Sequence, residues 1–127
     1  MSSPRTIAVL GASSNRRKYG NKCVRAYQAA GYRVYPVNPH ETEVEGLRAV
    51  PRLAEVPEPL ERISVYLQPE VTLQVLPEIA SAGAGEVWFN PGSADEQVVE
   101  EARRRGLPAR HGCSIVDVGY SPSQFPA

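Results

Sequence analysis

Residues 6–37, TIAVLGASSNRRKYGNKCVRAYQAAGYRVYPV, hold a strand, a loop, a helix and a second strand in succession. The apolar run 6–10 predicts a buried strand that ends at Gly11, which permits a sharp turn. Residues 21–30 have the apolar spacing of a helix, and 33–37 are rich enough in Val and Tyr to predict another strand. A strand, a helix and a strand in this order form the repeating unit of a parallel sheet.

The same alternation continues towards the C-terminus. Pro77 lies inside the second expected helix and predicts either a bend or an earlier end there, whereas Ser93 and Glu96 form an S-x-x-E capping box at the start of the third. Residues 40–60 predict a connection with at most a brief helix. The expected strands are 6–10, 33–37, 63–67, 86–89 and 107–111, and the expected helices are 21–30, 69–83 and 93–105. This order predicts an α/β protein with a three-layer, doubly wound, Rossmann-like fold around a five-stranded, mainly parallel sheet.

The length and composition fit one soluble domain. With 127 residues we expect a single domain over 1–127, with tails at 1–4 and 119–127. No apolar run approaches the ~20 residues of a membrane span, and no signal-peptide stretch precedes the first strand, so we expect a cytoplasmic protein without a membrane partner. Cys23 and Cys113 lack the spacing of a disulfide framework and predict ordinary buried thiols.

The charge is balanced overall but unevenly distributed. The chain has 14 basic and 14 acidic residues, yet residues 1–40 contain seven Lys or Arg and no Asp or Glu. A basic quarter in a neutral protein favours a local anionic ligand over nucleic acid, whose binding domains are usually strongly basic throughout. We therefore expect no nucleic-acid partner, and a nucleic-acid binder that uses this quarter is the third-ranked hypothesis.

The loop over residues 11–20 has the composition of a phosphate site. Hydroxyls and backbone amides of Ser13 and Ser14, with the N–H groups at the start of the following helix, favour an anion. The dinucleotide fingerprint G-x-G-x-x-G is absent, and Asn38 replaces the acid that would bind a ribose hydroxyl, which disfavours NAD. No Walker motif occurs. NADP and coenzyme A (CoA), which carry more phosphate, remain as candidates.

Five segments together resemble a known family. In chain order they are VLGASSNRRKYGNK, GYRVYPVNP, LQPE, WFNPGS and GLPARHGCSI. The chain resembles the small stand-alone CoA-binding domain proteins over about residues 5–118, and these are similar to the N-terminal domain of the succinyl-CoA synthetase α subunit. The resemblance implies that CoA lies across the strand ends. It also implies the CoA-holding part of such a synthetase without the separate domain that carries its phosphorylated histidine.

The resemblance assigns a role to each strand end. The first loop would hold the phosphates, the loop after the second strand would flank the nucleotide, and the later strand ends would face the pantetheine arm. By position, the implied cofactor-binding residues are Gly11, Ala12, Ser13, Ser14, Arg17, Lys18 and Tyr19 in the first loop, Val37, Asn38 and Pro39 after the second strand, and Gln68, Pro69, Asn90 and Gly92 at the later ends.

Two observations bear on catalysis. His111 and Cys113 lie two residues apart at the end of the last strand, but no carboxylate lies near in sequence to orient the histidine. The scattered His and Cys residues also predict no metal site. We expect a protein that binds CoA or an acyl-CoA without catalysis of its own, and a protein partner or a homo-oligomer is compatible with that role. The alternative is an NADP-dependent reductase, with Tyr66 and His111 as candidate proton donors.

Overall fold

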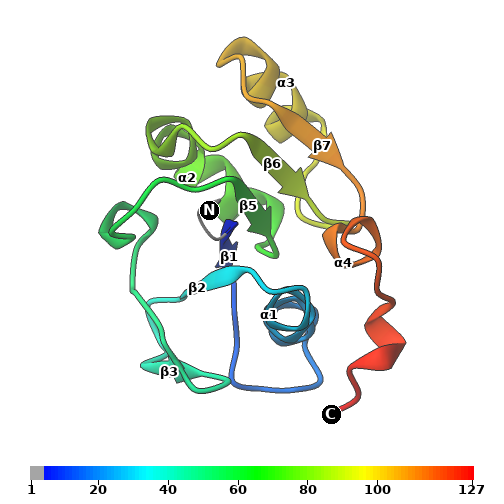
Figure 1. Ribbon diagram of the computed structural model, residues 1–127. Helices are drawn as coiled ribbons and strands as arrows, with labels where there is room; N and C mark the ends of the chain where they lie inside the picture. The colour runs from blue at the N-terminus through cyan, green and yellow to red at the C-terminus, as the bar shows by residue number, and fades with distance from the viewer. Residues whose placement is uncertain (1–4) are drawn as a thin grey trace.

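The computed structural model describes residues 5–127 and contains the expected central sheet (Figure 1). Its strands are β1 (Thr6–Leu10), β2 (Arg33–Val37), β5 (Arg62–Val65), β6 (Glu86–Phe89) and β7 (Ala109–His111). They lie in the order β2-β1-β5-β6-β7, and every neighbouring pair is parallel. The predicted Rossmann-like α/β fold is confirmed.

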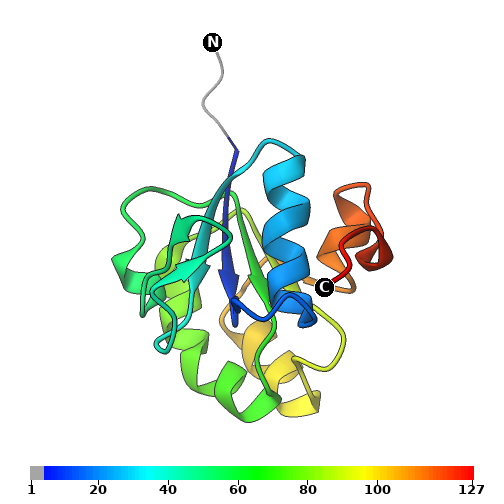
Figure 2. The same ribbon diagram turned by 90° about the horizontal axis from the view of Figure 1, so that it is seen from below.

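Helices cover both faces of the sheet (Figures 1 and 2). One face packs against α1 (Tyr19–Ala29) and α4 (Ser114–Asp117), and the other against α2 (Pro69–Ala82) and α3 (Glu96–Arg104). Each face has its own apolar core. The first core contains Cys23, Val24, Tyr27 and Ile115, and the second contains Leu76, Ile79, Val98 and Ala102. No helix in residues 5–127 is long and apolar enough to cross a membrane.

Strand β1 lies between the two cores and is buried along its whole length. Because side chains alternate along a strand, Ile7 and Val9 pack towards α1 while Ala8 and Leu10 pack towards α2. The chain passes from β1 to β2 on one side and returns to β5 on the other. The sheet therefore has a topological switch point between β1 and β5, where ligands of such folds bind.

The connection after β2 contains more structure than expected. It holds a hairpin, β3 (Glu43–Val44) and β4 (Leu47–Arg48), and the 3₁₀ helix η1 (Leu53–Glu55), which confirms the brief helix. The hairpin was not predicted, because strands of two residues show no alternation. Its turn is formed by Glu45 and Gly46, which have φ angles of 49° and 78°.

Several element boundaries differ from the sequence-based expectations. Helix α1 starts at Tyr19, two residues before the expected 21, and β5 and β7 are shorter than the predicted 63–67 and 107–111. Helix α2 continues past Pro77 to Ala82, so an earlier end is wrong. Pro77 is exposed, which keeps its ring out of the core.

The predicted capping box is also wrong. The side chain of Asp95 caps α3 by accepting a hydrogen bond from the Val98 N–H at 2.9 Å. Ser93 is buried and its Oγ donates to the Asn90 carbonyl at 2.7 Å, so it belongs to the turn after β6. The N-cap of this helix lies two residues later than expected, at Asp95 instead of Ser93.

The C-terminal residues 119–127, expected to be a tail, contain the 3₁₀ helix η2 (Pro122–Gln124). The segment returns beside α1 (Figure 2), and Phe125 packs against the α1-side core. The tail expected at residues 1–4 lies outside the described residues.

Candidate functional site

Two glycines bring the start of α1 against the carboxyl ends of β1 and β5. Gly11 has a φ of +84°, and a Cβ atom there would lie 2.4 Å from the Tyr66 carbonyl oxygen. A Cβ on Gly20 would lie 2.2 Å from the Gly11 carbonyl oxygen. Neither position has room for a side chain. The sequence predicts the sharp turn at Gly11. It does not predict the close approach at Gly20, although a second glycine at the end of the same loop is a signal for it.

The N-terminus of α1 has no cap from the described chain. Lys18 is the N-cap residue, its side chain makes no capping hydrogen bond, and no acidic residue lies in the first turn of residues 19–29. The first N–H groups of a helix have no partner inside the helix and carry a partial positive charge. This helix end can therefore receive an anion.

The uncapped helix end opens into a cleft of about 670 Å³, which we call the polar cleft. It joins residues from the ends of β1, β2, β5 and β6. It contains seven of the predicted residues, namely Gly11, Ser13, Lys18, Tyr19, Asn38, Gln68 and Gly92. The other lining residues are Gly20, His40, Glu41, Tyr66, Leu67, Val71, Pro91 and Ser93.

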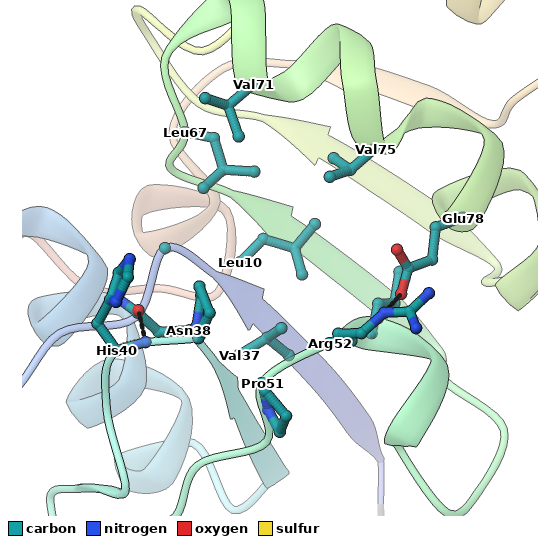
Figure 3. A pocket seen from close by; sticks show the side chains of 13 residues that line it. Leu10, Val37, Asn38, His40, Pro51, Arg52, Leu67, Val71, Val75 and Glu78 are labelled. Atoms are coloured by element: carbon teal, nitrogen blue, oxygen red, sulfur yellow. Dashed lines mark hydrogen bonds and ion pairs between the residues drawn. The ribbon is translucent and has the colours of Figure 1, made fainter.

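A second chamber of about 390 Å³, the apolar pocket, adjoins the polar cleft and shares Gly11, Asn38, His40, Leu67 and Val71 with it (Figure 3). Figure 3 shows aliphatic side chains converging on this space from the strand ends and from α2. Its aliphatic and proline lining is Leu10, Val37, Pro39, Pro51, Leu53, Leu67, Val71 and Val75. The chamber suits a flat or apolar group that needs few hydrogen bonds.

Polar pairs lie at the two ends of the apolar pocket (Figure 3). At one end, Arg52 and Glu78 form an ion pair with a separation of 3.8 Å between Nε and Oε1. At the other, the His40 N–H donates to Asn38 Oδ1 at 2.8 Å. Asn38 Nδ2 also donates to the Ala12 carbonyl at 2.8 Å, so this side chain links the first loop to the end of β2.

A third chamber of about 310 Å³, the side cavity, shares Tyr19, Tyr66 and Pro91 with the polar cleft. Its remaining lining is Asn90, Cys113 and Pro122. The three chambers therefore lie next to one another along the carboxyl edge of the sheet, with the polar cleft between the other two.

Four predicted residues lie outside the lining of these chambers. Ala12 is buried, and Pro69 is the first residue of α2. Arg17 is exposed. Ser14 is exposed as well, and both its N–H and its Oγ donate to the Glu41 carboxylate at 3.2 Å.

Asn90 lines the side cavity, but its side chain is engaged within the protein. Nδ2 donates to Ser64 Oγ at 2.8 Å and to the Val65 carbonyl at 3.0 Å, and Oδ1 accepts from the Ser114 N–H at 2.9 Å. The residue is only 2% exposed. Asn90 therefore ties the ends of β5 and β6 to α4.

The candidate proton donors and nucleophiles are not assembled. His111 stacks on Phe89 with ring centroids 5.5 Å apart and lies outside the lining of the three chambers, whereas Cys113 lines the side cavity. The Tyr66 hydroxyl is buried and has no partner among residues 5–127. Burial raises the pKa of Tyr66, so its phenol stays protonated. Residues 5–127 contain no group of three His, Cys, Asp or Glu side chains that could hold a metal ion.

Sequence reasoning missed most of the apolar pocket. Pro51, Arg52 and Leu53 come from the irregular connection, and Val71 and Val75 come from α2. In the sequence, the two valines have the spacing of the apolar stripe of the helix expected at 69–83. Val71 is exposed at 41%, and only the tertiary arrangement shows that this end of the stripe faces a cavity.

Two known proteins are similar to this chain over most of its length. The uncharacterized protein YneT from Bacillus subtilis is 30% identical over 100 residues, which are 79% of this chain and 74% of YneT. The solved structure of a conserved hypothetical protein from Pyrococcus furiosus has a TM-score of 0.82 at 35% identity, and the match covers 89% of this chain and 98% of that one.

A larger relative is the alpha subunit of the ADP-forming acetate–CoA ligase II from Pyrococcus furiosus, which is 32% identical over 117 residues. The match takes in 82% of this chain but 25% of the ligase subunit. The predicted resemblance to stand-alone CoA-binding domain proteins is thus confirmed. Since residues 5–119 match the family described as CoA binding domain, the chain belongs to the CoA-binding domain family.

Proposed function

We propose that this protein binds CoA or an acyl-CoA noncovalently along the carboxyl edge of its sheet and catalyses no reaction by itself. The observation that carries the proposal is the uncapped N-terminus of α1, which opens into a polar cleft that adjoins an apolar pocket. A ligand for these chambers needs a flat or apolar end, an anionic middle and a long polar arm. CoA has these three parts in this order.

The chambers suggest how the ligand would lie. The adenine would enter the apolar pocket beside Val37, Asn38 and Pro39. The phosphates would contact the first loop, where Lys18 lines the polar cleft at the helix end and Arg17 is nearby in sequence. Charge-assisted hydrogen bonds and the helix dipole would both favour this placement.

The pantetheine arm would follow Gln68 and Gly92 towards the side cavity. Pro69 would act by fixing the first turn of α2 below Gln68, and Asn90 by holding the neighbouring strand ends together. These four residues would position the arm and would not react with it.

The placement of the reactive groups supports the proposal that the protein catalyses no reaction by itself. A nucleophile needs a base within hydrogen-bond reach. His111 stacks on Phe89 outside the chambers, and Tyr66 keeps its proton in a buried position.

Thermal unfolding with CoA, acetyl-CoA, NADPH and ADP tests the proposal. A ligand at 100 times its dissociation constant stabilises a protein by about 2.7 kcal/mol, so CoA at such a concentration should raise the melting temperature by several degrees, and by more than ADP at the same concentration does. Lys18→Ala combined with Arg17→Ala should reduce the rise. Arg104→Ala with Arg103→Ala, a matched loss of two charges on α3, should leave it unchanged. A rise with NADPH alone would overturn the proposal.

A further inference from the structure

The loop of residues 11–18 between β1 and α1, which we call the phosphate loop, already holds an anion that the chain itself supplies. The Ser14 N–H donates to Glu41 Oε2 and the Ser14 Oγ donates to Glu41 Oε1, each at 3.2 Å. Two donors thus meet the two oxygens of one carboxylate. Two oxygens of a phosphate group would engage the same pair of donors in the same way.

The Ser14 N–H does not depend on Glu41 for its direction. Asn21, which is fully buried, donates from Nδ2 to the Ser13 carbonyl at 2.8 Å. Because a trans peptide is planar, with its C=O and N–H on opposite sides, this bond turns the Ser14 N–H towards Glu41. Arg25 Nε in turn donates to Asn21 Oδ1 at 2.8 Å. These two hydrogen bonds behind the loop hold the Ser14 N–H in its direction.

The Glu41 carboxylate is also a charge in the polar cleft. Glu41 lines this cleft together with Lys18, and it is the first acidic residue of the chain, after seven basic ones. An anion at this point repels an incoming phosphate and blocks the Ser14 donors as long as it stays in place.

We propose that Glu41 is an internal competitor for the phosphate loop, which a ligand phosphate displaces, and that it thereby sets how strongly the loop accepts phosphate and pyrophosphate groups. The CoA part of this inference rests on the proposed function. The anion part rests on Ser14, Asn21 and Glu41 alone, so the two can be tested separately.

The test uses Glu41→Gln, which keeps the shape of the side chain and removes its charge. The matched control is Glu43→Gln, which makes the same change two residues later on β3, where the side chain is exposed. Titration calorimetry measures the affinity of each protein for inorganic pyrophosphate and, separately, for CoA. Melting temperatures without ligand show that both variants are folded.

Glu41→Gln should bind both ligands about tenfold more tightly than the unaltered protein, because a neutral amide holds the Ser14 donors less strongly than a carboxylate does and one repulsion is removed. Glu43→Gln should change either affinity less than about twofold, as expected for a screened surface charge. Ser14→Ala should cost Glu41→Gln more pyrophosphate affinity than it costs the unaltered protein, since the neutral amide competes less strongly for this hydroxyl than the carboxylate does.

Three outcomes separate the two ideas. Equal affinities of the Glu41→Gln and Glu43→Gln variants for pyrophosphate would overturn the inference, whatever CoA does. Weaker pyrophosphate binding by Glu41→Gln would also overturn it, since Glu41 would then organise the loop. A gain in pyrophosphate binding without CoA binding by any of the proteins would support the inference and reject the proposed function.

Discussion

Gly11 and Gly31 have nearly the same backbone conformation in different surroundings. Their φ angles are +84° and +85°, but only at Gly11 would a Cβ meet backbone, whereas nothing lies within 4 Å of one at Gly31. We expect Gly11→Ala to lower the free energy of unfolding by about 3 kcal/mol or more and Gly31→Ala by about 1 kcal/mol, because only the first adds a clash to the strain of a left-handed residue. Urea unfolding measures both, and equal losses would contradict the close approach.

The buried thiol of Cys23 makes stability depend on pH. Burial raises the pKa of Cys23 from 9.0 to about 11, against the opposing hydrogen bonds with Ser64 and Ser114. Between these values the unfolded chain loses the thiol proton and the folded chain keeps it, so stability falls as the pH rises from 9 to 11. The contribution of this group to the fall is about 2–3 kcal/mol.

Cys23→Ser should remove this part of the decline, because a serine hydroxyl does not titrate in this range. Cys113→Ser, at a partly exposed position, is the control and should keep it. Burial also raises the pKa of Tyr27 to about 12, so some loss above pH 10 should remain in both variants. Urea unfolding at a series of pH values measures the slopes, and identical slopes for the two variants would refute the assignment.

Among the elements, α3 depends on the Asp95 cap. Replacing Asp95 by Ala should lower the free energy of unfolding by about 1 kcal/mol, since the Val98 N–H loses its acceptor. Asp95→Asn should retain most of the stability, because asparagine caps helices about as well. Chemical denaturation of the two variants is the measurement. If the alanine variant is as stable as the asparagine variant, the cap has no energetic role.

The sequence predicts those elements whose periodicity extends over several residues. Strand β1 and helix α2 have runs long enough to show their apolar pattern, and both match the structure closely. The hairpin β3–β4 and helix α4 could not be predicted in this way, because strands of two residues and a helix of four carry no readable period. The α3 cap was misplaced because Ser93 and Asp95 are both good cap residues, and only the packing of Ser93 decides between them.

At the scale of the whole molecule, Arg25 connects three distant segments. Its guanidinium donates to the Arg16 carbonyl at 3.0 Å, to Asn21 Oδ1 at 2.8 Å, and to the carbonyls of Phe125 and Pro126 at 2.9 and 2.7 Å. The loop before α1, α1 itself and the C-terminal segment thus share one side chain. The planar fork of arginine suits this set better than a lysine would.

We expect Arg25→Ala to lower the free energy of unfolding by about 2–3 kcal/mol and to release the C-terminal segment, since four carbonyl or amide oxygens lose a charged donor. Limited proteolysis should then cleave residues 121–127 faster. Arg25→Lys should restore the stability only in part. The exposed pair-forming Arg104 on α3 is the control, and its replacement by Ala should cost less than about 0.5 kcal/mol. Equal cleavage rates for the Arg25 and Arg104 variants would contradict this linkage.

The position of the candidate site could be predicted from the sequence, but the shape of its chambers could not. The rule that ligands bind at strand ends led to Gly11, Asn38 and Gln68, which line the polar cleft. The contact of Ser14 with Glu41 joins segments 27 residues apart, and no local pattern reports it. The apolar pocket likewise depends on how α2 lies over the connection after β2.

The strand order has a mechanical consequence. Within the central sheet, the first half of the chain meets the second along the ladder between β1 and β5, which runs from Thr6 to Leu10. Helix α4 also joins the two halves, because Ile115 packs with Val24 and the Ser114 carbonyl accepts from the Tyr27 hydroxyl at 2.9 Å. The two halves cannot separate unless these contacts of α4 with α1 break. The chain should therefore unfold as one cooperative unit. The slowest amide hydrogen exchange should occur together in β1 and β5.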